Sequence, residues 1–92
     1  MAEVQIIWTD YTIYRCRLRG FDLAEVESVI RHSEERYLDT ATGGRVVVGR
    51  YKKALIMIPY EAAGGRLTPV TVHMTTRPQI KSRVKSGRFM HE

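Results

Sequence analysis

The chain has 92 residues, which is enough for one domain with a single modest core across residues 1–92. Hydrophobic residues make up 43% and charged residues 27%, and this ordinary globular composition argues against wholesale disorder. The single cysteine, Cys16, excludes an internal disulfide and a zinc site built from paired cysteines. No apolar run is long enough to cross a bilayer, and the N-terminus lacks the pattern of a signal peptide, so we expect a cytoplasmic protein without a membrane partner.

The positive charge of the chain is unevenly distributed. Fifteen lysines and arginines stand against ten acidic residues, which gives a net charge of +5. Residues 1–46 carry six basic and eight acidic side chains, whereas residues 47–92 carry nine basic and two acidic ones. A strongly basic half favours a polyanion or an acidic chain as the partner.

The N-terminal segment predicts a strand followed by a helix. Val4 to Trp8 is short, apolar and β-branched, which is typical of a strand. Thr9 is a suitable N-cap for the helix that follows. Tyr11, Tyr14 and Leu18 share one face of that helix, so we expect this face to pack on the core.

A second helix is predicted over residues 22–32. Gly20 ends the first helix, and Asp22 with Glu25 has the spacing of a capping box. Apolar residues then repeat at helical spacing as far as Ile30. Arg31 and the histidine after it lie in the last turn, where the helix dipole favours cations.

After residue 36 the pattern changes to short strands separated by turns. Strands are predicted over residues 37–40, 45–51, 54–60 and 67–75. Pro59 has no N–H to donate, so the third of these strands is expected to fray or reach a sheet edge there. In the last one Val70, Val72 and Met74 are expected on one face, with the polar residues between them on a solvent-lined face.

The C-terminal segment predicts a short helix over residues 77–86. Thr76 and Gln79 form a T-x-x-Q capping box, Pro78 is tolerated in a first turn, and Gly87 is a stop signal. The element order predicts an α+β fold with an N-terminal strand, two helices, a three- or four-stranded antiparallel sheet and a short C-terminal helix. The helices are expected to pack on one face of the sheet.

The C-terminal helix carries the sharpest functional pattern. Arg77, Lys81, Lys85 and Arg88 are spaced to form one stripe, and Arg83 lies on the other side. No acidic residue interrupts this run, and like charges four residues apart destabilise an isolated helix. Local helix stability therefore does not explain the pattern. A phosphate backbone or an acidic protein partner explains it, and the alternative is a solvated helix face.

A second basic group lies at the predicted hairpin between the strands 45–51 and 54–60. It consists of Arg50, Lys52 and Lys53. If this hairpin lies on the same face as the C-terminal helix, the two make a groove; a solvated hairpin tip is the alternative. Tyr51 and Tyr60, at strand ends in the basic half, are candidates for stacking on nucleic-acid bases.

His73 is the histidine with the strongest case for chemistry. It lies within a predicted strand on the face expected to be solvent-lined, and histidine titrates near neutrality, as a general acid–base requires. A surface or packing role is the alternative. His32 is explained by the helix dipole, and His91 lies in a tail expected to fray.

Metal and cofactor sites are not predicted. The three histidines have no metal-ligand spacing, and the glycine pairs lack the K-[ST] of a phosphate-binding loop. Cys16 has arginines nearby but no identifiable partner histidine, so we expect an inert, partly buried thiol.

The order of motifs resembles a known family. It comprises I-I-W-T-D at residues 6–10, a first helix ending in Leu18-Arg19-Gly20-Phe21, an acidic second helix, a meander, and the ending P-V-T-V-H-M-T-T-R-P-Q-I-K-S-R-V-K-S-G-R-F. Over most of the chain this order is similar to the small BrnT-like proteins of the RelE/ParE-like toxin superfamily. Trp8-Thr9-Asp10 matches the W-x-D start of that family, whereas Arg19 stands where BrnT-like proteins often have a histidine.

The resemblance implies a toxin of a type II toxin–antitoxin pair. Such toxins usually cleave mRNA, free or on the ribosome, without a metal. Their antitoxin is a small, often acidic or DNA-binding chain that wraps the toxin and blocks its basic face.

Two functional hypotheses follow from the sequence. In the first, the chain is an RNA-binding, toxin-like protein and a metal-free endoribonuclease, with His73 and Arg77 as the acid–base and charge-stabilising pair. The residues expected to hold RNA phosphates are Arg50, Lys52, Lys53, Arg77, Lys81, Arg83, Lys85 and Arg88. In the second, the chain is a non-catalytic interaction protein whose basic tail docks a small acidic partner. A DNA-binding regulator is disfavoured because the second helix is acidic.

Overall fold

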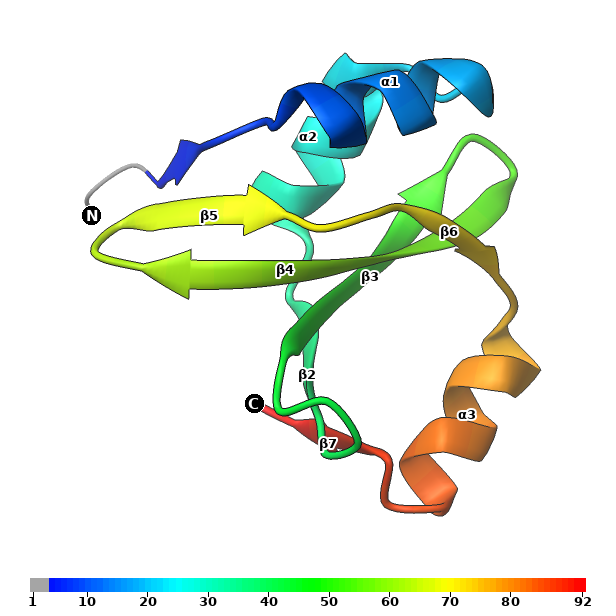
Figure 1. The fold of residues 1–92 in the computed structure, drawn as a ribbon. Coiled ribbons are helices and arrows are strands. Elements are labelled where there is room, and N and C mark those ends of the chain that lie inside the picture. Colours follow the sequence, from blue (N-terminus) through cyan, green and yellow to red (C-terminus); the bar gives the residue numbers. More distant parts are fainter. Residues whose placement is uncertain (1–3) are drawn as a thin grey trace.

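The computed structural model describes residues 4–92, and its elements follow the predicted order (Figure 1). The three helices are α1 (Asp10–Leu18), α2 (Leu23–His32) and α3 (Arg77–Lys85). The strands are β1 (Gln5–Ile6), β2 (Glu35–Asp39), β3 (Arg45–Tyr51), β4 (Ala54–Ala63), β5 (Arg66–Pro69), β6 (His73–Thr75) and β7 (Phe89–His91).

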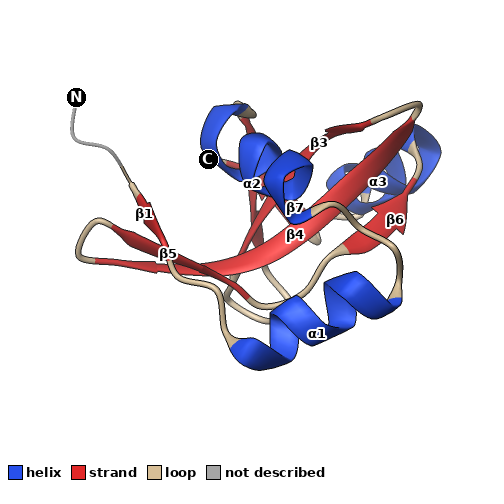
Figure 2. Ribbon diagram, turned by 90° about the horizontal axis from the view of Figure 1, so that it is seen from above, coloured by secondary structure: helices blue, strands red, loops and turns tan. Residues whose placement is uncertain are grey.

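All of these strands belong to one mixed sheet. The order across it is β1-β5-β4-β3-β2-β7, and β6 pairs with β4 beside β5. Pairing is antiparallel throughout except for β1, which lies parallel to β5. Figure 2 shows β4, the longest strand, running through the middle of the molecule. The α+β class is confirmed, and the sheet is larger than the three or four strands predicted.

The core has two parts, one on each face of the sheet. One part joins α2 to the sheet through Val26 and Ile30, which pack with Val47. The other joins α3 to the opposite face through Ile80, which packs with Val48. Because neighbouring residues of β3 point to opposite faces, its V-V-V run serves both parts. The expectation that all helices cover one face is therefore wrong for α3.

The helix termini follow the predicted capping signals. The hydroxyl of Thr9 accepts a hydrogen bond from the Thr12 N–H at 3.2 Å, and the Asp22 carboxylate accepts from the Ala24 N–H at 2.9 Å. Thr76 caps α3 in the same way through the Gln79 N–H. Capping side chains satisfy N–H groups that have no partner within the helix, so these three residues fix where the helices begin.

The expectation that α1 buries its aromatic face is wrong. Thr12 and Cys16 are the buried residues of α1, whereas Tyr11 and Tyr14 are exposed. The Thr12 hydroxyl donates to the Val70 carbonyl at 3.1 Å, which fixes the helix on the segment after β5. Periodicity shows which residues share a helix face, but it does not show which face turns inward.

Pro59 lies inside a continuous strand, contrary to the expected fray or edge. It pairs with Val46 of β3, and its carbonyl accepts from the Val70 N–H at 2.8 Å. The N–H and C=O of one strand residue point to the same side of the strand, so the position of the missing N–H lies on the edge of β4 away from β3. At Pro59 this edge faces the gap between the end of β5 and the start of β6. The proline therefore breaks no ladder pairing with β3.

The predicted strand over residues 67–75 is divided into β5 and β6. Between them Val72 is buried, whereas Val70 and Met74 are exposed, so the three do not share one face. Thr75 is buried rather than solvent-lined. The chain changes its path between the two strands to follow first one end of β4 and then the other.

The C-terminal residues form a strand that the sequence did not predict. β7 pairs with β2, with Met90 opposite Leu38. His91 therefore lies in the sheet, where its ring is 4.9 Å from that of Tyr37, instead of in a frayed tail. A three-residue strand carries almost no sequence signal, because its stability depends on the partner strand.

Candidate nucleic-acid interface

The cationic stripe on α3 is partly as predicted. Arg77, Lys81 and Lys85 border one hollow of about 330 Å³, together with Tyr37 and His91. Arg88 lies beyond the end of the helix and does not line this hollow. Its guanidinium donates to the two carboxylate oxygens of Asp39, at 3.2 and 3.3 Å.

Arg77 and Arg88 are therefore held by carboxylates of the chain itself. Arg77 donates to Glu35 at 2.5 Å, and the Tyr37 hydroxyl donates to the same carboxylate. Burial opposes ionisation of Glu35, but these two hydrogen bonds outweigh it and lower the pKa of the carboxyl. Burial, the hydrogen bond to Glu35 and the Glu35 charge raise the pKa of Tyr37 to about 12. Arg77 is about half exposed, so its guanidinium retains a solvent-accessible side.

The expected groove between the hairpin and α3 is present. Arg50, Lys52 and Lys53 line an open hollow of about 710 Å³ with Met74 to Arg77. Lys52 has φ 54°, a left-handed conformation that turns the chain tightly between β3 and β4. Leu55 and Thr75 also line the hollow, so the groove combines apolar and cationic side chains.

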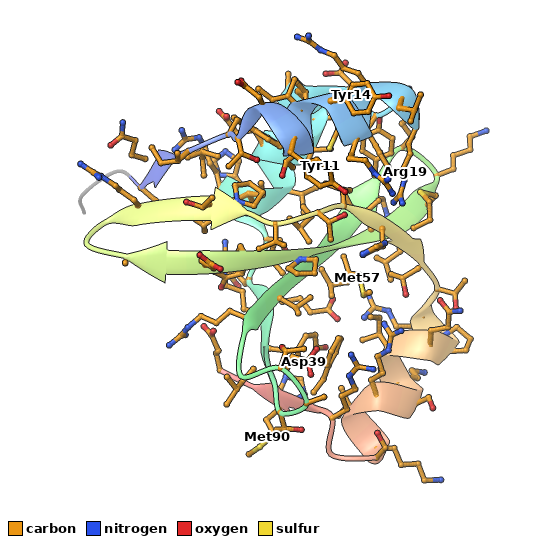
Figure 3. All side chains as sticks on the ribbon, in the orientation of Figure 1. Tyr11, Tyr14, Arg19, Asp39, Met57 and Met90 are labelled. Carbon is orange, nitrogen blue, oxygen red and sulfur yellow. The ribbon has the colours of Figure 1, made fainter. Side chains whose placement is uncertain are left out.

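His73 lies in a second group of cations, formed by arginines of two helices. It begins β6 and pairs with Met57 of β4. The Arg83 guanidinium of α3 is 3.0 Å from the Met57 sulfur, and Arg19 at the end of α1 donates to the Val72 carbonyl at 3.0 Å. Figure 3 shows Arg19 extending from the end of α1 toward β6. We call His73 with Arg15, Arg19 and Arg83 the His73 cluster.

The surroundings of His73 keep its imidazole neutral. Burial lowers the pKa of the ring below its ordinary value, and the charges of Arg19, Arg83 and Arg15 lower it further. At pH 7 the ring is therefore unprotonated and can accept a proton, while the guanidiniums beside it remain charged. A neutral base among fixed cations suits an anionic ligand that must lose a proton.

The sequence did not predict that Arg15 and Arg19 belong to this site. Arg77 was the expected partner of His73. A spacing of four residues places Arg15 and Arg19 on one side of the helix, and this was the available signal. Whether this side of the helix faces β6 depends on tertiary packing, which the spacing does not show.

The tyrosines chosen as stacking candidates do not serve as such. Tyr51 and Tyr60 are both buried in the core on the α2 face. The Tyr51 hydroxyl accepts a hydrogen bond from the Asp22 N–H at 2.7 Å, and the Arg36 guanidinium lies 5.5 Å from the centre of the Tyr60 ring. Strand-end position in the sequence was a poor guide to exposure.

Most of the cations at the site have no carboxylate partner within the described part of the chain. Across residues 4–92 the ion pairs involve Arg31, Arg45, Arg77 and Arg88. The groove cations Arg50, Lys52 and Lys53, and the arginines of the His73 cluster, are not among them. In the same residues no group of three histidine, cysteine or acidic side chains could hold a metal ion. Cys16 is buried, and burial raises the pKa of its thiol.

No family model matches the chain, and no match was found among curated proteins or solved structures. None of the helices formed by residues 4–92 has the length and apolar character that spanning a bilayer requires.

Proposed function

We propose that the chain is an RNA-binding protein that cleaves RNA without a metal, at the His73 cluster. The observation that carries the proposal is the place of His73 between two arginines, beside a groove lined by further cations. Arg83 contacts Met57, which pairs with His73, and Arg19 binds the carbonyl of the preceding Val72. β6 connects the two features, because it begins with His73 and its other residues, Met74 and Thr75, line the groove. A phosphate backbone that follows the groove would pass next to the imidazole.

The proposed reaction uses the RNA itself as the nucleophile. His73 accepts the proton of a ribose 2′-hydroxyl, and the 2′-oxygen attacks the adjacent phosphorus. The bond from phosphorus to the 5′-oxygen breaks, and that oxygen takes a proton from solvent or from the imidazolium. The products are a 2′,3′-cyclic phosphate and a 5′-hydroxyl. Arg83 and Arg19 would stabilise the negative charge that develops on the phosphoryl oxygens.

Arg77 has a positioning and binding role in this proposal. Its guanidinium is paired with Glu35, and it is not among the arginines whose charges act on His73, so the charge-stabilising role passes to Arg83 and Arg19. Its exposed side lines the groove with Lys52 and Lys53 and would bind a flanking phosphate. Lys81 and Lys85 would extend this binding along α3.

The toxin assignment rests on the BrnT-like and RelE/ParE-like sequence resemblance. It adds to the proposal a cytoplasmic location and a small partner chain that restrains the nuclease. An RNA-cleaving surface of this kind would require such restraint in its own cell. The competing proposal, a non-catalytic chain whose basic tail docks an acidic protein, would leave the neutral imidazole without a role.

Removal of the two groove lysines is expected to weaken RNA binding in a salt-dependent way. For the Lys52→Ala/Lys53→Ala variant, the slope of log K against log salt should become shallower by about 0.7 for each RNA phosphate that the protein no longer neutralises. Fluorescence anisotropy with a labelled single-stranded oligonucleotide, at several salt concentrations, measures this slope.

The matched control removes the same number of charges elsewhere. Arg31→Gln/Arg45→Gln acts on arginines paired with Glu27 and Glu92, outside the groove. This control should leave the slope close to that of the wild type. Equal effects from both variants would mean that net charge alone governs binding. No binding to RNA even at low salt would favour the acidic-partner alternative.

A further inference from the structure

The outward face of α1 carries three large apolar side chains. Tyr11, Tyr14 and Leu18 are 66%, 62% and 66% exposed. At 100° per residue they lie within about 60° of one another around the helix, so they form a continuous stripe. Figure 3 shows Tyr14 pointing out from α1 into the surroundings. Large apolar residues gathered in one exposed strip mark an interaction site more strongly than scattered ones do.

The stripe cannot be buried by a rotation of α1 on the sheet. The opposite face of the helix is already packed through Thr12 and Cys16. The Thr12 hydroxyl donates to Val70, and the Arg19 guanidinium donates to Val72, so both halves of the helix are attached to the chain below. The exposure of the stripe is therefore a fixed property of the fold.

A hollow runs along one side of the stripe. It has a volume of about 510 Å³ and is lined by Ile13, Tyr14, Arg17 and Leu18, with Asp10 at one end. The stripe and the hollow together offer a ridge and an adjacent groove, which suits the apolar side of a partner helix.

The charges around the stripe determine the kind of partner that fits. The Arg15 guanidinium lies 5.9 Å from the centre of the Tyr11 ring, and Arg17 lines the hollow. Asp10 is the only acidic residue of α1. A second copy of the chain would place these arginines against each other, whereas carboxylates on the partner would complement them. A nucleic acid would stack on the tyrosines but would gain little from Ile13 and Leu18.

We infer that the stripe docks an acidic amphipathic helix of a partner protein. Apolar residues of that helix would cover Tyr11, Tyr14 and Leu18, and its flanking carboxylates would face Arg15 and Arg17. Arg15 belongs both to the His73 cluster and to the border of the stripe. The inference can still be tested apart from RNA cleavage, since Tyr14 and Leu18 take no part in the cluster or the groove.

A designed peptide tests this inference directly. The probe is a fluorescein-labelled helix of about 18 residues, with leucines at i, i+3, i+4 and i+7 and glutamates on both flanks. Two control peptides have the same leucines in scrambled order, or lysines in place of the glutamates. We expect the acidic amphipathic peptide to bind the wild-type chain at least about tenfold more tightly than either control.

The matched variants locate the binding surface. Tyr14→Ser/Leu18→Ser should weaken peptide binding at least about tenfold, because it removes the centre of the stripe. Leu38→Ser/Met90→Ser removes two other exposed apolar side chains, on β2 and β7, and should change binding less than about twofold. Thermal unfolding confirms that both variants fold, since all four side chains are exposed.

Three kinds of result would overturn the inference. The first is equal binding of the acidic, scrambled and lysine peptides, or unchanged binding to Tyr14→Ser/Leu18→Ser. The second is a loss of RNA binding in that variant, which would assign the stripe to RNA. The third is a wild-type dimer in sedimentation that the variant dissociates, which would assign the stripe to a second copy.

Discussion

His73→Gln is expected to cleave RNA at least about 100-fold more slowly than the wild type, because glutamine keeps a polar side chain of similar reach but cannot accept the proton. The rate is measured under single-turnover conditions with a 5′-labelled transcript in EDTA. Wild-type cleavage should persist in EDTA and leave 2′,3′-cyclic phosphate ends. Its rate should rise with pH until the imidazole is deprotonated, and because the pKa of His73 is lowered, the midpoint of that rise should lie below the ordinary histidine value of about 6.5.

Binding provides the control for this experiment. His73→Gln should hold RNA about as well as the wild type, because the cations that bind phosphate remain in place. Arg83→Gln should lower the cleavage rate and also weaken binding, since it removes a charge that acts on the reacting phosphate. Cleavage by His73→Gln at the wild-type rate would remove the imidazole from the mechanism. A requirement for a divalent ion would contradict metal-free cleavage.

Gly49→Ala is expected to destabilise the fold by about 1–3 kcal/mol. Gly49 lies in β3 below α2, and a Cβ at this position would be 2.5 Å from Cγ1 of Val29 and 3.4 Å from Cβ of Ser33. Valine is stiff at χ1, so it cannot swing its methyl group out of the way without strain. The helix must move away from the strand instead. Urea unfolding followed by circular dichroism gives the free energy of unfolding.

A second substitution tests whether this close approach is the cause. Val29→Ala removes the methyl groups that clash, so Gly49→Ala should cost less in a Val29→Ala background than in the wild type. Gly44→Ala is the matched control, because its Cβ would meet only the Thr42 hydroxyl, at 3.3 Å in an exposed turn. Equal losses of stability for Gly44→Ala and Gly49→Ala, or strict additivity with Val29→Ala, would contradict the close approach of α2 to β3.

The local features of the fold were predictable from the sequence. Thr9, Asp22 and Thr76 begin the three helices as their capping patterns indicated, and the limits of β3 agree with the predicted strand. These features depend on hydrogen bonds between residues a few positions apart. Interactions of that range leave a recognisable pattern in a single sequence.

Features that depend on tertiary packing were not predictable in the same way. The outward turn of Tyr11 and Tyr14 follows from the docking of α1 on residues 69–72, which lie more than fifty positions away. Glu35 binds Arg77 across 42 positions, and Asp39 binds Arg88 across 49. The residues of the site differ from the predicted ones for the same reason. Arg15 and Arg19, at the C-terminal end of α1, act on His73, which lies more than fifty positions later in the chain.

The most direct test of the proposed RNA interface is a titration of the ¹⁵N-labelled protein with a short single-stranded RNA at low salt, followed by amide chemical shifts. We predict that the largest changes fall on residues 15, 19, 50–53, 73–77 and 83, around the groove and the His73 cluster. Changes concentrated on α2 and β1, or no change beyond those caused by an equal concentration of salt, would contradict the proposed interface.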